Sequence, residues 1–553
     1  MRTMTLHNPA LAQAMRQRAL VLVAVVLAQA GATFSDAAVT AYDSSSTEAA
    51  SAPVAATGAG RVRGYVDAGI LAFKGIPYGA DTATTRFRAP RPPEPWPDIR
   101  DATQFGPRAP QPAGRRSAAA GPAPDAPMES EDCLRLNVWT HALRDGGARP
   151  VLVYFHGGAY NSGTVTEDLY DGARLCRRGN VVVVTVNHRL NGFGYLYLAQ
   201  IGGERFAGSG NAGMLDLVLA LEWVRDNISE FGGDPRNVTI FGQSGGGAKC
   251  ATLMAMPTAR GLFHRVWTMS GQQIAGRDPT RATETVRVVL EKLGIAPGEL
   301  GRLDTLPRKQ LAEAMRGGDW TPVMDGSALP RHPFQPDASP LSRDIPMVMG
   351  NTRDETRNLI GGRDPALFEL TWEDLPAAIE RNVGQFIGDL QPGDIVSNYR
   401  KMYPAYSPSD IFFAATTAAR SWKSMVVQLD VRAKDSPGRT WAYHVNWGSP
   451  ADGGKWGAPH TLDIPLVFDN TAEDRLTRDA GPEAQRLADM MSESLLAFSR
   501  KGDPNTPSLP EWPVYDLEKR ATMIFDLDPR AVDDPRGGER KLFAPAVYVQ
   551  PGT

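Results

Sequence analysis

A serine set among glycines is the feature of this sequence that most directly indicates chemistry. Residues 242–246 read GQSGG, which fits the pattern G-x-S-x-G, and they follow an apolar run at 237–241. In this pattern a strand turns sharply into a helix and holds the serine oxygen clear of the sheet. Glycine at positions 242 and 246 avoids a clash with neighbouring backbone. The sequence therefore predicts Ser244 as a nucleophile that attacks a substrate carbonyl.

A nucleophilic serine also needs hydrogen-bond donors for the negative oxygen that develops during attack. Residues 154–160 read YFHGGAY and follow another apolar run, so the N–H groups of Gly157 and Gly158 can point outward there. The N–H of Gly245, first in the predicted helix, supplies a third donor at the positive end of the helix dipole. Taken alone, HGG is an ordinary tight loop. Its pairing with the serine motif favours an oxyanion hole.

The general base is sought among the histidines that follow Ser244, because chains with this serine turn place the acid second and the histidine last. Four of the eight histidines satisfy this order: His264, His332, His444 and His460. The first lies in a helix-to-strand connection, the second precedes any suitable acid, and the third lies within a predicted strand. The first and third positions favour a structural histidine, and the chain order excludes the second. By elimination, the sequence predicts His460, in a loop, as the base.

The acid is predicted in residues 350–357, GNTRDETR, which follow a strand-like run and supply Asp354 and Glu355. A carboxylate there can accept the second ring N–H of His460 and fix its tautomer. It also stabilises the imidazolium that forms when Ser244 loses its proton. Two solvated surface acids are the alternative interpretation. The residues alone leave open which of the two is used.

Strand-like and helical runs alternate along the chain and are the elements that must position these residues. Residues 214–228 repeat apolar side chains at helical spacing and stop at Gly232 and Gly233. Near-continuous apolar runs predict strands covered on both faces, at 136–140, 151–155, 180–187, 237–241, 266–270, 346–350 and 440–446. The alternation predicts an α/β fold with a mostly parallel central sheet flanked by helices. The helix-rich spans 270–346 and 350–439 are expected to form a helical cap.

Composition and charge exclude several other classes of protein. The chain has 553 residues, with 59 Lys and Arg against 62 Asp and Glu, a formal net charge of -3. No basic field attracts nucleic acid and no polybasic run attracts anionic lipid. No metal-ligand cluster or dinucleotide-binding glycine motif is evident, so we expect neither a metal nor a cofactor. Residues 61–545 are expected to form a single domain.

The N-terminal region has the pattern of a secretory signal peptide, predicted at 1–32. Arg16 and Arg18 precede an apolar run at 19–28, and small residues follow it. The run is too short to cross a bilayer comfortably, so we expect a secreted or periplasmic protein without a permanent membrane anchor. Residues 33–60 are small and polar and predict a disordered lead-in.

Two further features concern the rest of the chain. Residues 107–128 are rich in Pro, Ala and Gly, which predicts a mobile surface loop. The three cysteines, Cys133, Cys176 and Cys250, are too few for a disulfide scaffold, and which of them could pair is left open. Burial as small apolar side chains is the expectation for Cys176 and Cys250.

With these residues assembled, the sequence resembles the type-B carboxylesterases, the group that contains cholinesterases and bacterial para-nitrobenzyl esterases. The resemblance runs from about residue 62 to residue 526. The motifs occur in the family order at 73–78, 86–96, 130–139, 156–160, 186–196, 220–247 and 261–271. The resemblance implies an α/β-hydrolase fold with Ser244 as nucleophile, Glu355 rather than Asp354 as acid, and His460 as base. It also implies Gly157, Gly158 and Gly245 as oxyanion donors.

The sequence departs from the family pattern at four places. The family commonly has Glu before the serine and Ala after it, whereas this chain has Gln243 and Gly245, so the N–H donor is kept and the local charge differs. Many members tie an early loop by a disulfide to the cysteine that matches Cys133, and here no cysteine precedes it. The loop at 107–128 is therefore expected to be untethered. Thr356 stands where glycine often follows the acid.

These observations predict an exported serine carboxylesterase that works without a cofactor. Its partner would be a small-molecule carboxylic ester, hydrolysed through an acyl-enzyme intermediate. The same triad could act on amides, carbamates or thioesters, because the leaving group is met by the cap. A non-catalytic, cholinesterase-like binding protein is a further alternative, and the retained serine, histidine and acid argue against it. The natural ester and the choice between monomer and homodimer are left open.

Overall fold

The structure is a computed structural model that describes residues 52–111 and 128–551. The predicted signal peptide and most of the predicted loop at 107–128 lie outside the described residues.

The predicted disordered lead-in at 33–60 lies partly inside the described residues, and there the prediction is wrong. Val54–Thr57 forms strand β1, which pairs antiparallel with β2, Gly60–Arg63. Ala55 and Val62 are fully buried in this hairpin, and their burial stabilises it despite its small, polar composition.

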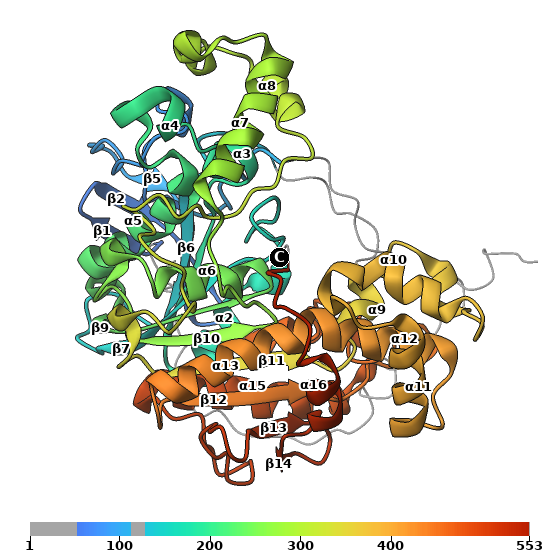
Figure 1. The fold of residues 1–553 in the computed structure, drawn as a ribbon. Helices are drawn as coiled ribbons and strands as arrows, with labels where there is room; N and C mark the ends of the chain where they lie inside the picture. The colour runs from blue at the N-terminus through green and yellow to red at the C-terminus, as the bar shows by residue number, and fades with distance from the viewer. Residues whose placement is uncertain (1–51, 112–127, 552–553) are drawn as a thin grey trace, which may run out of the picture. The chain divides into compact units, whose positions relative to one another are not determined.

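A large sheet forms the centre of the fold (Figure 1). It has 11 strands in the order β14-β13-β12-β11-β10-β9-β7-β8-β6-β4-β3. The strands β13, β12, β11, β10, β9, β7 and β8, which are consecutive across the sheet, are parallel to one another. At the two edges, β14 on one side and β6, β4 and β3 on the other are each antiparallel to their neighbours. A small separate sheet joins β1, β2 and β5. The remaining bounds are β3 Tyr65–Asp67, β4 Ile70–Pro77, β5 Arg100–Asp101, β6 Arg135–Thr140, β7 Arg149–Phe155, β8 Val182–Val186, β9 Gly233–Gln243, β10 Arg265–Met269, β11 Met347–Thr352, β12 Thr440–Val445, β13 Ala521–Phe525 and β14 Arg530–Asp533.

The predicted strands are all present, as β6 to β12. Every residue of β8, β11 and β12 is buried, which explains why their sequences are continuous apolar runs rather than alternating ones. The strands at 54–77 and 521–533 were not predicted; β1, β2, β3 and β14 among them have only three or four residues, and such short runs give a weak signal.

Helices cover both faces of the sheet and enclose two hydrophobic cores. Val153 of β7 packs in one core with α5, α6 and α13, whereas the next residue, Tyr154, packs in the other with α2, α14 and α15. The helix bounds are α2 Ala173–Gly179, α3 Asn191–Tyr195, α4 Ala199–Gly202, α5 Ala212–Asn227, α6 Gly245–Leu253, α7 Pro279–Leu293, α8 Arg308–Ala314, α9 Glu355–Leu359, α10 Leu375–Ile387, α11 Pro392–Met402, α12 Pro408–Thr417, α13 Lys423–Asp435, α14 Asp463–Phe468, α15 Pro482–Lys501 and α16 Gly537–Phe543. The predicted helix at 214–228 is α5 with a short 3₁₀ extension, Ile228–Phe231, which Gly232 caps.

The helices of the span 350–439, which was assigned to a helical cap, pack in two different places. Helices α10, α11 and α12 lie together (Figure 1) around a third core of their own, which includes Leu375, Tyr399 and Phe412. In contrast, α13 packs against β11 and β12 of the main sheet. The cap prediction is therefore wrong for 423–435, because the apolar face of α13, with Met425 and Leu429, joins the sheet core.

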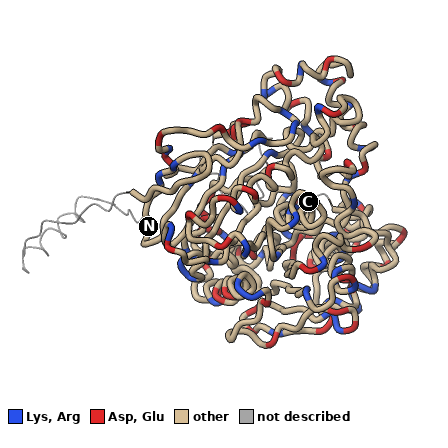
Figure 2. Tube along the Cα trace, turned by 90° about the vertical axis from the view of Figure 1, so that its left-hand side faces the viewer, with Lys and Arg blue, Asp and Glu red and all other residues tan. Residues whose placement is uncertain are grey.

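Basic and acidic residues are interspersed along the described chain (Figure 2). Cys133, Cys176 and Cys250 are buried and unpaired, as small apolar residues would be, which confirms the expectation for Cys176 and Cys250.

A buried ion pair links the loop after β8 to α5. The guanidinium Nε of Arg189 lies 2.8 Å from Oδ2 of Asp216, and the two side chains are 2% and 0% exposed. The same Oδ2 accepts the backbone N–H of Arg189 at 3.0 Å, and the Nη1 of Arg189 donates to the carbonyl of Arg88 at 2.8 Å. Every charged atom of the pair thus has a partner, as a buried pair requires.

We predict that Asp216→Asn lowers the free energy of unfolding by about 3–5 kcal/mol, because it leaves the Arg189 charge buried and without a counterion. Urea denaturation followed by fluorescence measures the change. The matched control is Glu313→Gln, which breaks the ion pair of Glu313 with Arg316. The side chains of Arg316 and Glu313 are 66% and 68% exposed. This control should change stability little. Equal effects of the two substitutions would contradict the role given to Asp216.

Candidate active site

Ser244 lies where β9 ends and α6 begins, as the sequence predicts. Its backbone angles are φ 56° and ψ -126°, a strained conformation for a residue with a side chain. A Cβ at Gly246 would lie 1.9 Å from the carbonyl oxygen of Phe155, and one at Gly242 would lie 2.4 Å from the backbone of Gly246. Glycine at both positions therefore permits the turn, which presents the partly exposed serine at the end of the sheet.

Glu355 is the carboxylate that contacts His460. It is fully buried at the start of α9, and its Oε2 bonds to Nδ1 of the ring. Its Oε1 accepts hydrogen bonds from Ser270 Oγ at 2.5 Å, the N–H of Thr352 at 2.8 Å and Asn351 Nδ2 at 3.1 Å. Burial alone would raise the pKa of Glu355, but the ring and these donors lower it to about 2. The carboxylate is thus ionised at neutral pH.

Asp354, the other candidate acid, binds the backbone of the histidine loop instead. Its Oδ2 accepts the N–H of Ala458 at 2.8 Å, and its own N–H donates to the carbonyl of Ala458 at 2.8 Å. From α9, Asn358 Nδ2 donates to the carbonyl of His460 at 2.5 Å. Adjacent residues therefore have separate tasks: Glu355 contacts the ring and Asp354 holds the loop that carries it.

The second ring nitrogen of His460 faces the serine turn. Its Nε2 lies 3.2 Å from the side-chain nitrogen of Gln243, the residue before Ser244. With the Nδ1 proton directed to Glu355, Nε2 is an acceptor and can receive the amide N–H of Gln243. The hydrogen bonds between described residues include none from the Ser244 hydroxyl to His460. In this structure the side-chain amide of Gln243 is hydrogen-bonded to the ring nitrogen that a nucleophilic serine needs as its proton acceptor.

The loop after β7 brings the predicted oxyanion glycines to the same junction. A Cβ at Gly157 would lie 3.2 Å from the Cβ of Ser244, and one at Gly245 would lie 2.3 Å from the carbonyl oxygen of Ala159. Gly158 and Ala159 have φ values of 83° and 55°, left-handed conformations that fold the loop against α6. The N–H of Gly245 is the first of its helix, so it has no acceptor within the helix.

The other histidines that follow Ser244 have structural contacts. The ring of His264 accepts the N–H of Val238 at 3.1 Å, and the ring of His332 accepts the N–H of Gly276 at 3.1 Å. The ring of His444, in β12, bonds to a neighbouring asparagine side chain. Of the four, His460 is the one brought to the serine turn and to a carboxylate.

Several residues near the site were not identified from the sequence. Ser270 follows β10 and Asn351 lies in β11, and both bind Glu355. Their position at the carboxyl ends of parallel strands, where ligands of such sheets bind, is the signal that could have indicated them. Asp463, three residues after His460, is fully buried and accepts the hydroxyl of Tyr443 at 3.0 Å; burial raises its pKa to about 7.

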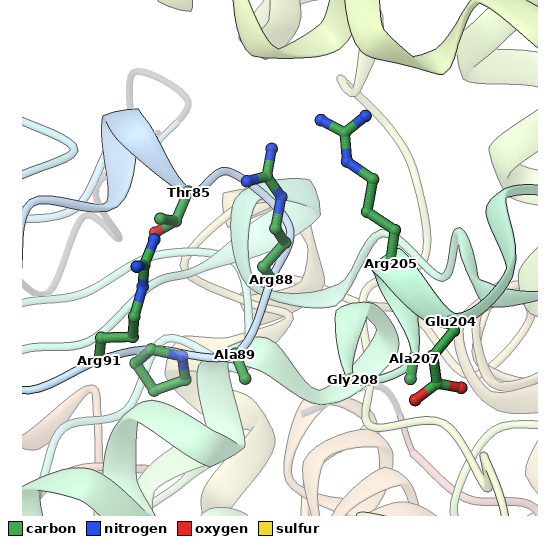
Figure 3. A pocket seen from close by; sticks show the side chains of 9 residues that line it. Thr85, Arg88, Ala89, Arg91, Glu204, Arg205, Ala207 and Gly208 are labelled. Carbon is green, nitrogen blue, oxygen red and sulfur yellow. The ribbon is translucent and has the colours of Figure 1, made fainter.

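A surface pocket of about 330 Å³ lies elsewhere and is lined by Arg88, Arg91 and Arg205 but by no predicted site residue (Figure 3). Arg88 and Arg205 share the single carboxylate of Asp304, so two of the three cations are held by one anion. Within 52–111 and 128–551, no cluster of three or more His, Cys, Asp or Glu side chains is placed to hold a metal ion. The same residues include no helix with the length and apolarity needed to cross a membrane.

Comparison with known proteins identifies the family. The model of the carboxylesterase family matches residues 51–542. A para-nitrobenzyl esterase of Bacillus subtilis (strain 168) is 34% identical over 507 residues, which cover 88% of this chain and 97% of that protein. A phenmedipham hydrolase of Pseudarthrobacter oxydans is 32% identical over 496 residues, which cover 85% of this chain and 94% of that protein.

Solved structures agree with the sequence comparison. The carboxylesterase EST55 of Geobacillus stearothermophilus has a TM-score of 0.76 and 36% identity, covering 89% of this chain and 99% of that one. The mostly parallel sheet with helices on both faces is the α/β-hydrolase fold. The chain belongs to the carboxylesterase family.

Proposed function

We propose that Ser244, Glu355 and His460 form the catalytic triad of this carboxylic ester hydrolase, with Gly157, Gly158 and Gly245 as oxyanion donors. One observation carries the proposal: an ionised, fully buried Glu355 holds Nδ1 of His460, so that Nε2 is directed at the turn that contains Ser244. A carboxylate that accepts the Nδ1 proton selects the tautomer in which Nε2 can take a proton.

The reaction follows from this arrangement. Nε2 of His460 exchanges the amide of Gln243 for the hydroxyl of Ser244, the adjacent residue, and takes its proton as the oxygen attacks the ester carbonyl. The N–H groups of the three glycines stabilise the negative oxygen of the tetrahedral intermediate. His460 then protonates the leaving alcohol, and a water that it activates releases the acid from the acyl-enzyme.

We further propose that the protein is exported and that residues 61–545, together with strand β1 that pairs with β2 at the start of this range, form its single catalytic domain. The basic residues before the apolar run at 19–28 and the family match over 51–542 support this. The N-terminal peptide mass of the native protein should show that residues 1–32 have been removed. A mature protein that retains them would contradict export through a cleaved signal.

The first prediction on the site concerns the nucleophile. Ser244→Ala should reduce kcat for a nitrophenyl ester by a thousandfold or more, because no other group can form the acyl-enzyme. Ser494→Ala is the matched control, since this serine of α15 is fully buried and its hydroxyl has no hydrogen-bond partner. The control should keep normal activity. Near-normal activity of Ser244→Ala would refute the assignment.

The second prediction separates the two adjacent acids. Glu355→Gln places an amide against Nδ1 of His460 and favours the tautomer with the proton on Nε2, which cannot accept the serine proton. We expect kcat to fall by about 10³ to 10⁴-fold. Asp354→Asn keeps an oxygen for the N–H of Ala458 and should cost far less. Steady-state kinetics of both variants decide, and a larger loss for Asp354→Asn would move the acid by one residue.

A further inference from the structure

Lys249 is a buried cation beside the site with no part in the triad. It lies in α6, five residues after Ser244, and is 0% exposed. Its Nζ donates to the carbonyl oxygens of His156 at 3.0 Å and Ala159 at 2.9 Å. The ion pairs of the described residues include none with this lysine, and no carboxylate contributes to its electrostatic environment. Burying an ammonium group without a counterion is costly, so its position calls for a specific reason.

The two carbonyls that Lys249 binds flank the predicted oxyanion donors. The carbonyl of His156 and the N–H of Gly157 belong to one planar peptide group and point in opposite directions. A hydrogen bond from Lys249 to that oxygen therefore fixes the direction of the Gly157 N–H on the other side. The same bond polarises the peptide group and makes its N–H a stronger donor.

The strained backbone of the loop after β7 also needs contacts from outside the loop to stabilise it. Ala159 has a φ of 55° although it carries a Cβ, and Gly158 before it has a φ of 83°. Such conformations persist where the surroundings over-determine them. The hydrogen bonds between described residues give the Ala159 carbonyl one donor, and it is Lys249. The lysine thus joins the helix that starts at Ser244 to the strained end of the loop.

We propose that Lys249 is a positioning residue for oxyanion stabilisation, because it binds the carbonyls at both ends of residues 156–159 and so holds the loop whose N–H groups stabilise the oxygen that becomes negative when Ser244 attacks an ester. This rests on the proposed function of Ser244. The lysine touches neither substrate nor reacting atoms. Its effect is therefore expected in the tetrahedral intermediate and not in the binding of the ester.

The groups that face Lys249 are neutral. Burial lowers the pKa of His156 to about 3 and holds that of His188 well below its ordinary value, and in each case the nearby lysine lowers it further. Burial raises the pKa of the Cys250 thiol. Burial also lowers the pKa of Lys249 itself to about 7. An amine keeps two N–H groups after losing its extra proton, so both carbonyl contacts persist in either state.

The test uses Lys249→Met, which keeps the length and apolar stem and removes both donors. We expect kcat for a nitrophenyl ester to fall by about 10 to 10²-fold, somewhat less than the loss of a whole oxyanion donor, with KM changed by less than about threefold. A trifluoromethyl ketone, which binds as a tetrahedral oxyanion adduct, should lose affinity by a similar factor. The parent methyl ketone should not.

Cys250→Ala is the matched control, because Cys250 is the next residue of α6 and is fully buried, and no hydrogen bond between described residues joins its side chain to the loop after β7 or to the triad. It should keep the wild-type kcat and the wild-type affinity for both ketones. Should Lys249→Met fail to fold, Lys249→Gln, which keeps one short donor, is measured instead and should show the same selective loss at smaller size. A variant that keeps wild-type kcat and trifluoromethyl ketone affinity, or one that loses both ketones equally, overturns the proposal.

Labelling of the serine distinguishes a failure of the role given to Lys249 from a failure of the proposed triad. A fluorophosphonate should label the wild-type protein and Lys249→Met at one group per chain, the variant more slowly, and should not label Ser244→Ala. Absence of labelling in the wild type would overturn the proposed function itself. Normal labelling with unchanged oxyanion affinity in Lys249→Met would overturn only the role of the lysine.

Discussion

Close packing of main chain against main chain at the carboxyl ends of β7 and β9 is the constraint on which the rest of the site depends. A Cβ at Gly246 would lie 1.9 Å from the carbonyl oxygen of Phe155, and one at Gly271 would lie 2.0 Å from that of Ser244. Backbone cannot rotate away as a side chain can. The parallel register that pairs Phe155 with Gly242 therefore fixes the position of the serine turn relative to the loop after β7.

Buried charges provide the second layer of organisation, and each is held by several donors or acceptors. Glu355 keeps its charge because a hydroxyl, an amide and a backbone N–H converge on one oxygen while the histidine ring binds the other. Lys249 is held by two carbonyls of the neighbouring loop. Such groups are oriented before any substrate arrives, which is the condition under which dipoles stabilise developing charge most effectively.

The sequence predicted much of this from local patterns. Seven apolar runs gave the central strands, and the glycines around Ser244 gave the strand-to-helix turn, because strands buried on both faces and tight turns restrict residue type strongly. Edge elements were missed: β1 lies in a segment that composition marked as disordered, and its hairpin is stabilised by buried contacts of Ala55 and Val62. The placement of α13 against the sheet was also missed, since an apolar helix face does not indicate which core it joins.

For the site itself, the sequence determined which kinds of residue are present and in what order: a serine between glycines, a pair of adjacent acids and a late histidine. Tertiary structure decided which acid faces the ring, that Ser270 and Asn351 support it, and that Gln243 occupies Nε2 of His460. Side chains that are neighbours along the chain, such as Asp354 and Glu355, point to different partners. Their directions depend on where distant segments pack, and residue types along one chain do not encode those distances locally.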